Sequence, residues 1–230
     1  MAALGNYYFS AGYHYLYASS FVVASLRTNL ENKICLRTYP VRSQASSPIT
    51  IIDAILATCA TQPEFGPVSF GERYKKREYV GAELGANNPI HEVIIEAYSL
   101  FGGSARVLSL LSIGTGNPGV VSLPSSDEDL HTTMREMLND CEQKAQDVER
   151  RIGRLGIYSR FSVEQGMQKR QPSQTADPGW ITAQTETYLA HHETCEKLEI
   201  FVQNVGGKVG PISLDQLRMF LSRPFVNLTF

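Results

Sequence analysis

The sequence predicts an α/β fold in which helices cover a mostly parallel sheet. Residues 107–113 form an apolar run of the kind found in strands that are covered on both faces. Residues 90–101 carry apolar side chains at helical spacing, between an Asn-Asn-Pro start and a Gly-Gly end. A strand around Tyr79-Val80 precedes that helix, so strand, helix and buried strand follow one another as in a βαβ unit.

The helix at 90–101 has well-defined ends in the sequence. Asn88 suits the N-cap, and Pro89 suits the first helical position, where an N–H would have no partner. Gly102 and Gly103 suit the end of the helix. The expected apolar face consists of Ile90, Val93, Ile94, Ala97, Tyr98 and Phe101.

The chain before this helix predicts two strands and one helix. Residues 1–19 are rich in aromatic side chains without a clear period, so they remain an unassigned, irregular leader. Residues 20–26 and 34–39 predict strands. A helix should follow, with Ser47 as its N-cap and Pro48 in its first position. Its expected inner face consists of Ile49, Ile52, Leu56 and Cys59.

After the glycine loop at 114–116, one long amphipathic helix is expected. Ser125 or Ser126 caps it, and its first turn is acidic, as the helix dipole favours. Apolar residues then recur by threes and fours to about residue 155. A coiled-coil seam would give the same pattern, although a single helix packed on the sheet is the favoured interpretation.

The last part of the chain predicts a second amphipathic helix, from Trp180 to about residue 205. The remaining tail, 206–230, contains a short helix after Ser213. A length of 230 residues suits one sizeable core. We therefore expect one main domain over 20–205.

Composition narrows the classes of partner. Hydrophobic residues make up 43% of the chain and charged residues 19%, which is ordinary for a globular protein. The net charge of −2 gives no basis for nucleic-acid binding. One basic cluster, from Arg73 to Arg77, is interpreted as a solvated loop, with contact to anionic lipid as the alternative.

The four cysteines, at positions 35, 59, 141 and 195, are scattered and form no CxxC pair. Cys59, Cys141 and Cys195 fall within helical patterns, which indicates reduced, buried thiols and a cytoplasmic protein. The N-terminus has no basic segment or clean cleavage site, so no signal peptide is expected. No apolar run is long enough for a spanning helix, which predicts a protein that is soluble or peripheral to membranes.

Several motifs in order resemble the second half of a patatin-like phospholipase domain. They are Ser47-Pro48-Ile49-Thr50, Ala57-Thr58-Cys59-Ala60, the stretch from Tyr79 to Pro89, Leu111-Ser112-Ile113-Gly114-Thr115-Gly116, and the stretch from Tyr158 to Gly166. The resemblance covers roughly residues 20–200. It implies part of a three-layer α/β fold, with a mostly parallel sheet between helices and without the N-terminal half that carries the nucleophile.

The resemblance also implies a chemistry, the hydrolysis of lipid acyl esters in lipid metabolism. The family uses a Ser-Asp dyad, with the serine on a Gly-x-Ser-x-Gly elbow and a glycine-rich loop for the oxyanion. This sequence has no Gly-x-Ser-x-Gly motif, and Gly81 stands at the family's Asp position. Losing either dyad residue costs several powers of ten in rate. We therefore expect a truncated, catalytically inactive chain with no catalytic residues, a pseudoenzyme; the alternative is a non-catalytic lipid-binding or protein-interaction module.

Two residues could be mistaken for replacements of the dyad. Ser104 lies in Gly102-Gly103-Ser104, at a helix end before a strand, the reverse of an elbow, and is interpreted as a turn residue. Glu83 would lie about 7 Å beyond residue 81 in an extended segment, too far to replace the Asp. A serine within hydrogen-bonding distance of an acidic side chain, beside inward-pointing amides in a cleft, would contradict the prediction of inactivity.

The sequence predicts no metal ion and no cofactor. His191 and His192 would point to different sides of a helix, and His91 is interpreted as a surface or supporting residue. Residues 114–119 fit the dinucleotide pattern Gly-x-Gly-x-x-Gly. Pro118 and the extended residues after it do not suit that site, so a chance match is favoured over a nucleotide-binding protein.

The expected loss of half a domain has a consequence for association. A sheet without the nucleophile strand would expose an inner strand as an edge, which promotes pairing with other chains. We expect poor solubility or self-association through that edge. A lipid or membrane surface is the other expected partner.

Overall fold

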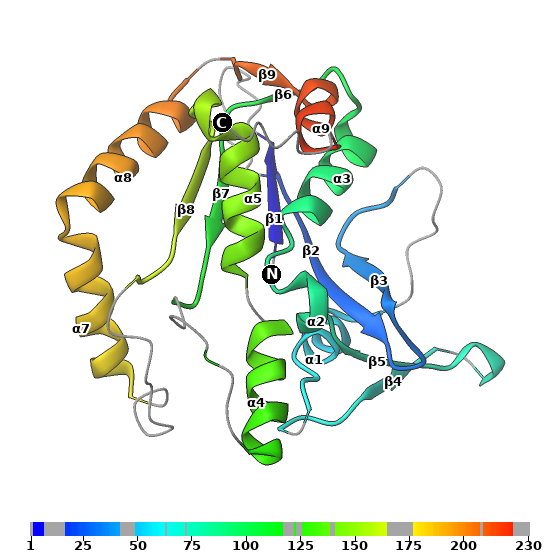
Figure 1. Ribbon diagram of the computed structural model, residues 1–230. Coiled ribbons are helices and arrows are strands. Elements are labelled where there is room, and N and C mark those ends of the chain that lie inside the picture. The colour runs from blue at the N-terminus through cyan, green and yellow to red at the C-terminus, as the bar shows by residue number, and fades with distance from the viewer. Residues whose placement is uncertain are drawn as a thin grey trace, which may run out of the picture. The chain divides into compact units, whose positions relative to one another are not determined.

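The computed structural model forms two compact units, Met1–Leu100 and Phe101–Phe230 (Figure 1). The structure describes residues 2–6, 17–41, 49–62, 64–71, 73–116, 122, 126–138, 141–164, 177–207 and 209–222.

The first unit contains one five-stranded sheet, and all its strand pairings are antiparallel. Its strands are β1 (Ala2–Asn6), β2 (Tyr17–Leu26), β3 (Asn29–Arg37), β4 (Val68–Phe70) and β5 (Arg77–Gly81). The prediction of a mostly parallel sheet is wrong here. Short connections join β2 to β3 and β4 to β5, and such hairpins allow only antiparallel pairing.

The start of the chain is not an irregular leader where the structure describes it. β1 pairs with β2 from Ala2 opposite Phe21 to Asn6 opposite Tyr17. β2 is therefore the central strand, because it also pairs with β3 and β5. The aromatic residues of 1–19 follow no clear period, so β1 was not predicted from the sequence.

The helix α1 (Ile51–Thr58) follows, with Thr50 as its N-cap in a capping box with Asp53. The expected capping residues, Ser47 and Pro48, lie outside the described residues. The predicted inner face is wrong for Ile52, Leu56 and Cys59, which are exposed. Ala57 is fully buried instead, and the Thr58 hydroxyl donates to the carbonyl of Val23 at 2.8 Å. The helix approaches the sheet so closely that small residues form the contact.

The predicted helix at 90–101 is confirmed as α3 (Ile90–Phe101), which buries Ile90 and Ile94. A short α2 (Glu83–Ala86) connects β5 to α3. The core of the sheet lies between β2, β3, β5 and α1. It consists of Val22, Ala24, Leu36, Ala57 and Tyr79.

The second unit contains one parallel strand pair, β7 (Leu110–Ile113) with β8 (Tyr158–Phe161). The crossover between them holds α4 (Asp127–Leu138), capped by Ser126, and α5 (Glu142–Ile152). These elements form a strand–helix–strand crossover with two helices. The predicted single helix to residue 155 is therefore divided, and its last residues form a 3₁₀ turn, η2 (Gly153–Leu155).

The predicted strand at 107–113 is also divided. Its start belongs to β6 (Arg106–Val107), which pairs with β9 (Ile212–Ser213) in a separate sheet. β5 and β7 lie in different sheets, so the predicted βαβ unit around α3 is wrong. The parallel partner of β7 is β8, which follows later in the chain.

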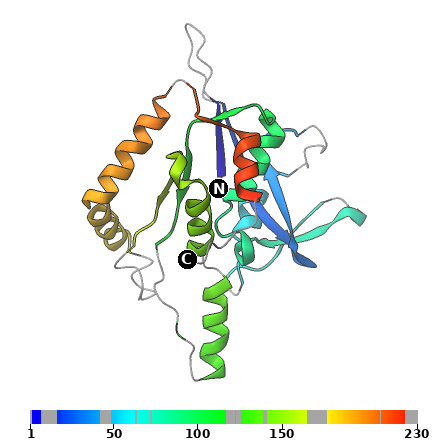
Figure 2. The same ribbon diagram turned by 45° about the horizontal axis from the view of Figure 1, so that its top comes forward.

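The predicted helix at 180–205 is two helices, α7 (Pro178–Leu189) and α8 (His192–Val205). In both views α5 and α8 lie on opposite sides of β8 (Figures 1 and 2). Phe161 of β8 meets Phe201 of α8 edge to face, with ring centroids 6.4 Å apart. The helix predicted after Ser213 is confirmed as α9 (Leu214–Ser222), which packs on α5 and buries Leu217.

None of the helices in the described ranges is both long and apolar enough to cross a bilayer.

Self-association through a sheet edge stays a prediction. β7 alternates buried and exposed side chains, and Ile113 at its end is 75% exposed.

Candidate functional site

Gly81, which the resemblance aligns with the catalytic Asp of patatin-like domains, ends β5 and packs tightly against the chain after α1. Its N–H donates to the carbonyl of Ala60 at 3.0 Å. A Cβ atom at this position would lie 3.0 Å from both the carbonyl oxygen of Thr58 and the hydroxyl of Thr61. Few real Cβ atoms approach backbone so closely, so a side chain fits here only if the neighbouring chain shifts.

A small cavity of about 310 Å³ lies beside Gly81, between β2, the end of α1 and α2. Its polar lining comes from Thr58, Thr61, Glu83 and Asn87. The lining holds threonine hydroxyls and the Glu83 carboxylate but no serine, so it contains no serine dyad. Glu83 begins α2, which corrects the expectation that it lies in an extended segment.

The other sequence-predicted site residues are dispersed. Ser104 lies in an exposed turn after α3, as predicted. His91 is half-buried in the first turn of α3. His191 is the residue before α8, and only His192 belongs to the helix, which corrects their placement on consecutive helical positions. Of the glycine pattern 114–119, the structure describes only residues 114–116.

Among the described residues of the second unit, two serines lie near an acidic side chain. The Ser126 hydroxyl donates to the Asp129 carboxylate at 2.6 Å in the exposed cap of α4. The second serine is Ser162. The Ser162 hydroxyl is 3.3 Å from the Glu142 carboxylate, and Ser162 is 6% exposed. The same carboxylate accepts a hydrogen bond from the Arg160 guanidinium in an ion pair. A carboxylate neutralised by a guanidinium is a poor general base, because its charge already has a partner.

Arg160 connects this group into a buried network. Its guanidinium donates to the Ser112 hydroxyl at 2.8 Å and to the Cys141 sulfur at 3.2 Å. Burial alone would lower the pKa of Arg160, but the hydrogen bond and charge of Glu142 outweigh it and raise that pKa. Burial raises the pKa of the Cys141 thiol. The group therefore holds β7, β8 and α5 together with a fixed cation and neutral thiol.

Ser162 and Glu142 do not meet the remaining conditions for catalysis. Neither lines the small cavity at Gly81 or the larger cavity beside β3 and α3. Gly114 packs against Arg160 and Ser162, and a Cβ there would lie 2.5 Å from the guanidinium. An acyl ester has no space at the hydroxyl. The Ser126–Asp129 pair lies in an exposed helix cap and also lines neither cavity. The absence of an activated serine stays a prediction.

The larger cavity, of about 890 Å³, lies in the first unit between β2, β3, α1 and α3. Much of its wall is aliphatic or aromatic, including Phe21, Leu36 and Ile95. Charged residues from three elements also reach it: Lys33, Arg37, Arg77, Glu92 and Glu96. Ligand sites commonly combine this size with an apolar lining and a few polar groups.

A buried ion pair forms part of this wall. Arg37 of β3 holds the carboxylate of Glu96 of α3 with two nitrogens, and the Nη2–Oε1 distance is 2.6 Å. The Tyr39 hydroxyl donates to the same carboxylate at 2.9 Å. The side chains of Glu96 and Arg37 are 5% and 18% exposed. The group ties β3 to α3, whose residues are distant in sequence.

This ion pair changes the ionisation of its neighbours. Burial would raise the pKa of Glu96, but hydrogen bonds from Arg37 and Tyr39 outweigh it, and the pKa is lowered. Burial and the hydrogen bond to Glu96 raise the pKa of Tyr39. Burial and the charge of Glu96 raise the pKa of the Cys35 thiol from 9.0 to about 12. Cys35 is therefore a neutral, unreactive thiol near neutral pH.

The four cysteines are free, as predicted, but their expected burial holds only in part. Cys141 is buried and Cys35 is half-buried, whereas Cys59 and Cys195 are exposed. Among the described residues, no group of three or more His, Cys, Asp or Glu side chains could hold a metal ion.

Comparison with known proteins adds no identification. No protein-family model, no curated protein and no solved structure matches the chain.

Proposed function

We propose that residues 20–205 are the C-terminal portion of a patatin-like domain that does not hydrolyse acyl esters. In this proposal the chain acts as a non-catalytic binding module in lipid metabolism. The order of the motifs supports the family. One observation supports the absence of activity: Gly81 occupies the position of the catalytic Asp, and its surroundings leave little space for a side chain.

The chemistry of acyl transfer explains why this observation supports inactivity. A neutral serine hydroxyl needs an adjacent base to attack an ester, and the oxyanion needs donors already in place. Gly81 provides no base. The Ser162–Glu142 pair provides no alternative, because Arg160 neutralises the carboxylate. Ester turnover at Gly81 would need a serine and a base from another part of the chain or from another protein.

The larger cavity favours a lipid-binding module over a protein-interaction module. Its volume of about 890 Å³ and its aliphatic lining suit an acyl chain. Lys33 and Arg37 are already paired with Glu92 and Glu96, whereas Arg77 has no ion pair among the described residues. A single cation beside an apolar wall suits an amphiphile with an anionic head.

Restoring the carboxylate alone should not restore hydrolysis. In a Gly81→Asp variant, we expect no turnover of p-nitrophenyl butyrate above that of the buffer, because no serine lies in the adjacent cavity. The variant should also lose about 1–3 kcal/mol of unfolding free energy, since the new Cβ meets the Thr58 carbonyl at 3.0 Å. Ester hydrolysis and chemical denaturation measure the two effects.

Gly66→Asp is the matched control. A Cβ at Gly66 has no atom within 4 Å, so the same substitution there should be nearly neutral. Turnover by the wild-type chain, or a gain of turnover in Gly81→Asp but not in Gly66→Asp, would contradict the proposal.

A further inference from the structure

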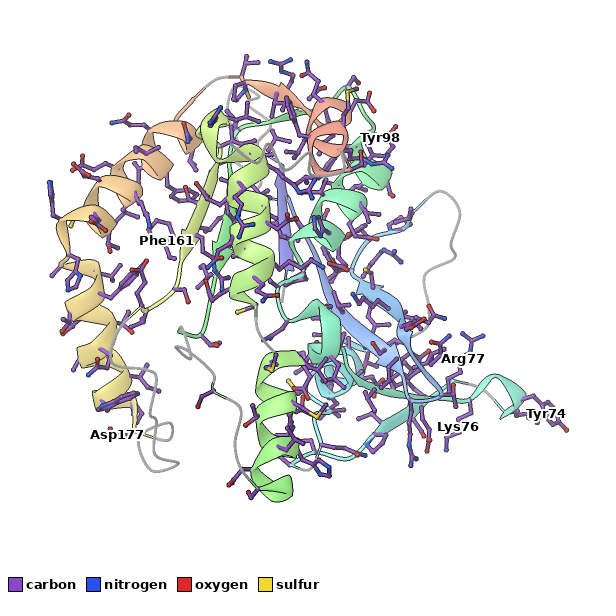
Figure 3. All side chains as sticks on the ribbon, viewed as in Figure 1. Tyr74, Lys76, Arg77, Tyr98, Phe161 and Asp177 are labelled. Atoms are coloured by element: carbon purple, nitrogen blue, oxygen red, sulfur yellow. The ribbon has the colours of Figure 1, made fainter. Side chains whose placement is uncertain are left out.

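The turn between β4 and β5 gathers basic and aromatic side chains at an exposed point. Arg73, Tyr74, Lys76 and Arg77 are all exposed, and Tyr74 is 101% exposed. These four residues form the basic hairpin patch. Figure 3 shows Tyr74 at the outer end of the hairpin, with Lys76 and Arg77 nearer the sheet. The whole chain has a net charge of −2, so this concentration of positive charge is local.

The base of the hairpin is well fixed. The rings of Phe70 and Tyr79 stack with centroids 3.9 Å apart and planes 12° from parallel. Tyr79 is 8% exposed and belongs to the core of the sheet. Arg77 lies opposite Phe70 in the β4–β5 pairing. The strands that carry the basic hairpin patch are therefore held in place by packing at the base of the hairpin.

A second unusual surface lies on α1. Ile51 and Ile52 are 69% exposed, Ile55 is 47% exposed and Leu56 is 50% exposed. These four aliphatic side chains form the α1 face. The helix buries Ala57 instead, and half of its eight residues offer large apolar side chains to solvent. A contiguous exposed apolar patch of this kind marks an interaction site.

The two surfaces meet. Arg77 of the basic hairpin patch and Ile51 and Ile55 of the α1 face line the same cavity, together with exposed Ile95 of α3. Arg77 and Tyr79 point to one face of the strand, because side chains two residues apart share a face. The first unit thus places one cation of the patch, Arg77, and aliphatic side chains of the α1 face beside one opening, and the rest of the patch extends from Arg77 along the hairpin.

We propose that the basic hairpin patch and the α1 face dock the chain on a bilayer surface that contains anionic phospholipid. The cations lie against lipid phosphates, Tyr74 sits at the headgroup level, and the isoleucines enter the acyl boundary. Charge complementarity selects this occupant. An anionic bilayer offers both negative phosphates for the cations and an apolar interior for the aliphatic side chains. The proposal goes beyond the loss of hydrolysis and depends neither on that loss nor on the family.

Vesicle flotation with the whole chain tests this surface. Wild-type protein should float with vesicles of phosphatidylcholine containing roughly a quarter phosphatidylserine, and much less with phosphatidylcholine alone. Each cation near such a surface contributes roughly a fivefold factor, so R73Q/K76Q/R77Q should weaken binding roughly a hundredfold. Flotation separates bound protein from self-associated protein, which stays at the bottom.

A variant with the same loss of charge is the control. Arg150, Arg154 and Lys197 are exposed residues of the second unit. R150Q/R154Q/K197Q should float within about twofold of the wild-type chain if the position of the charges matters, rather than their number. Circular dichroism of each variant establishes that the fold is retained.

The apolar contact is tested separately by I51S/I55S, which keeps every charge. It should reduce flotation severalfold, and the loss should persist at high salt, where screening weakens the cationic contribution. Failure of the wild-type chain to float would overturn the proposal. So would equal losses in the two charge variants, or unchanged flotation of R73Q/K76Q/R77Q.

Discussion

Replacing Glu96 with alanine should lower the free energy of unfolding by about 3–5 kcal/mol. The change leaves the Arg37 guanidinium in a site where its side chain is only 18% exposed, without the carboxylate that it contacts through two nitrogens. It also removes the acceptor of the Tyr39 hydroxyl. An unpaired buried charge costs far more than the net contribution of the intact pair, because desolvation is no longer offset.

Chemical denaturation measures this loss, with Glu31→Ala as the matched control. Glu31 is exposed on β3 of the same unit, so its removal should change the unfolding free energy by less than about 0.5 kcal/mol. In Arg37→Ala/Glu96→Ala the loss should be smaller than the sum of the two single losses, since no charge is left alone. Additive losses would contradict an ion pair.

The same cluster makes stability depend on pH in a defined direction. The pKa of Glu96 is lowered, so this carboxylate contributes stability above the unfolded pKa of about 4.3, which is lost as the pH falls through the folded pKa. The pKa of Cys35 is raised from 9.0 to about 12, so its contribution is present below pH 9.0 and lost as the pH rises towards about 12. Glu96→Gln should flatten the acid slope, as measured by denaturation at several pH values.

Replacing Arg160 with methionine should cost about 2–4 kcal/mol of unfolding free energy. The guanidinium serves three partners at once, Glu142, Ser112 and Cys141, and its side chain is 13% exposed. Methionine keeps the length of the side chain but leaves the Glu142 carboxylate, which is 19% exposed, without its cation.

Arg150→Met is the control for this variant. Arg150 is exposed on α5 and, within the part of the chain that the structure describes, its hydrogen-bond partner is Gln146 at 3.4 Å, so its loss should be within about 0.5 kcal/mol of zero. Equal effects at the two positions would mean that the network around Arg160 is only a surface feature.

Elements with strong local signals could be predicted from the sequence. The start and end of α3 were found because Asn-Asn-Pro and Gly102-Gly103 act on the backbone beside them. The face of α1 could not be found in this way. Its sequence is apolar on both sides, and only the close approach to β2 decides that Ala57 is inside and Ile52 outside.

The positions of helix breaks and the pairing of strands could not be predicted, because they depend on tertiary contacts. The pattern from 180 to 205 continues through residues 190 and 191, which contain neither Gly nor Pro, yet two helices form. The apolar run at 107–113 gave no indication that its two ends pair with different strands, β9 and β8. Strand pairing between distant segments has no local signature.

Within the candidate sites, the sequence alone could indicate single positions but not pairs of residues from distant segments. Gly81 could be identified by its place in a motif. The Arg37–Glu96 pair joins residues that are 59 positions apart, and only the fold brings them together. A signal did exist for the network in the second unit. Arg160 lies in β8 and Ser162 follows its last residue, so an alternating pattern would place the two on one side, and a buried arginine needs a carboxylate.

The central claim is that the chain holds no activated serine. Labelling with a fluorophosphonate tests it most directly. Such reagents form a stable adduct only with a serine hydroxyl that an adjacent base makes nucleophilic. Intact-mass measurement of the folded chain should show no adduct after prolonged exposure. A stoichiometric adduct, mapped by peptide mass to Ser162, Ser104 or any other serine, would contradict the claim.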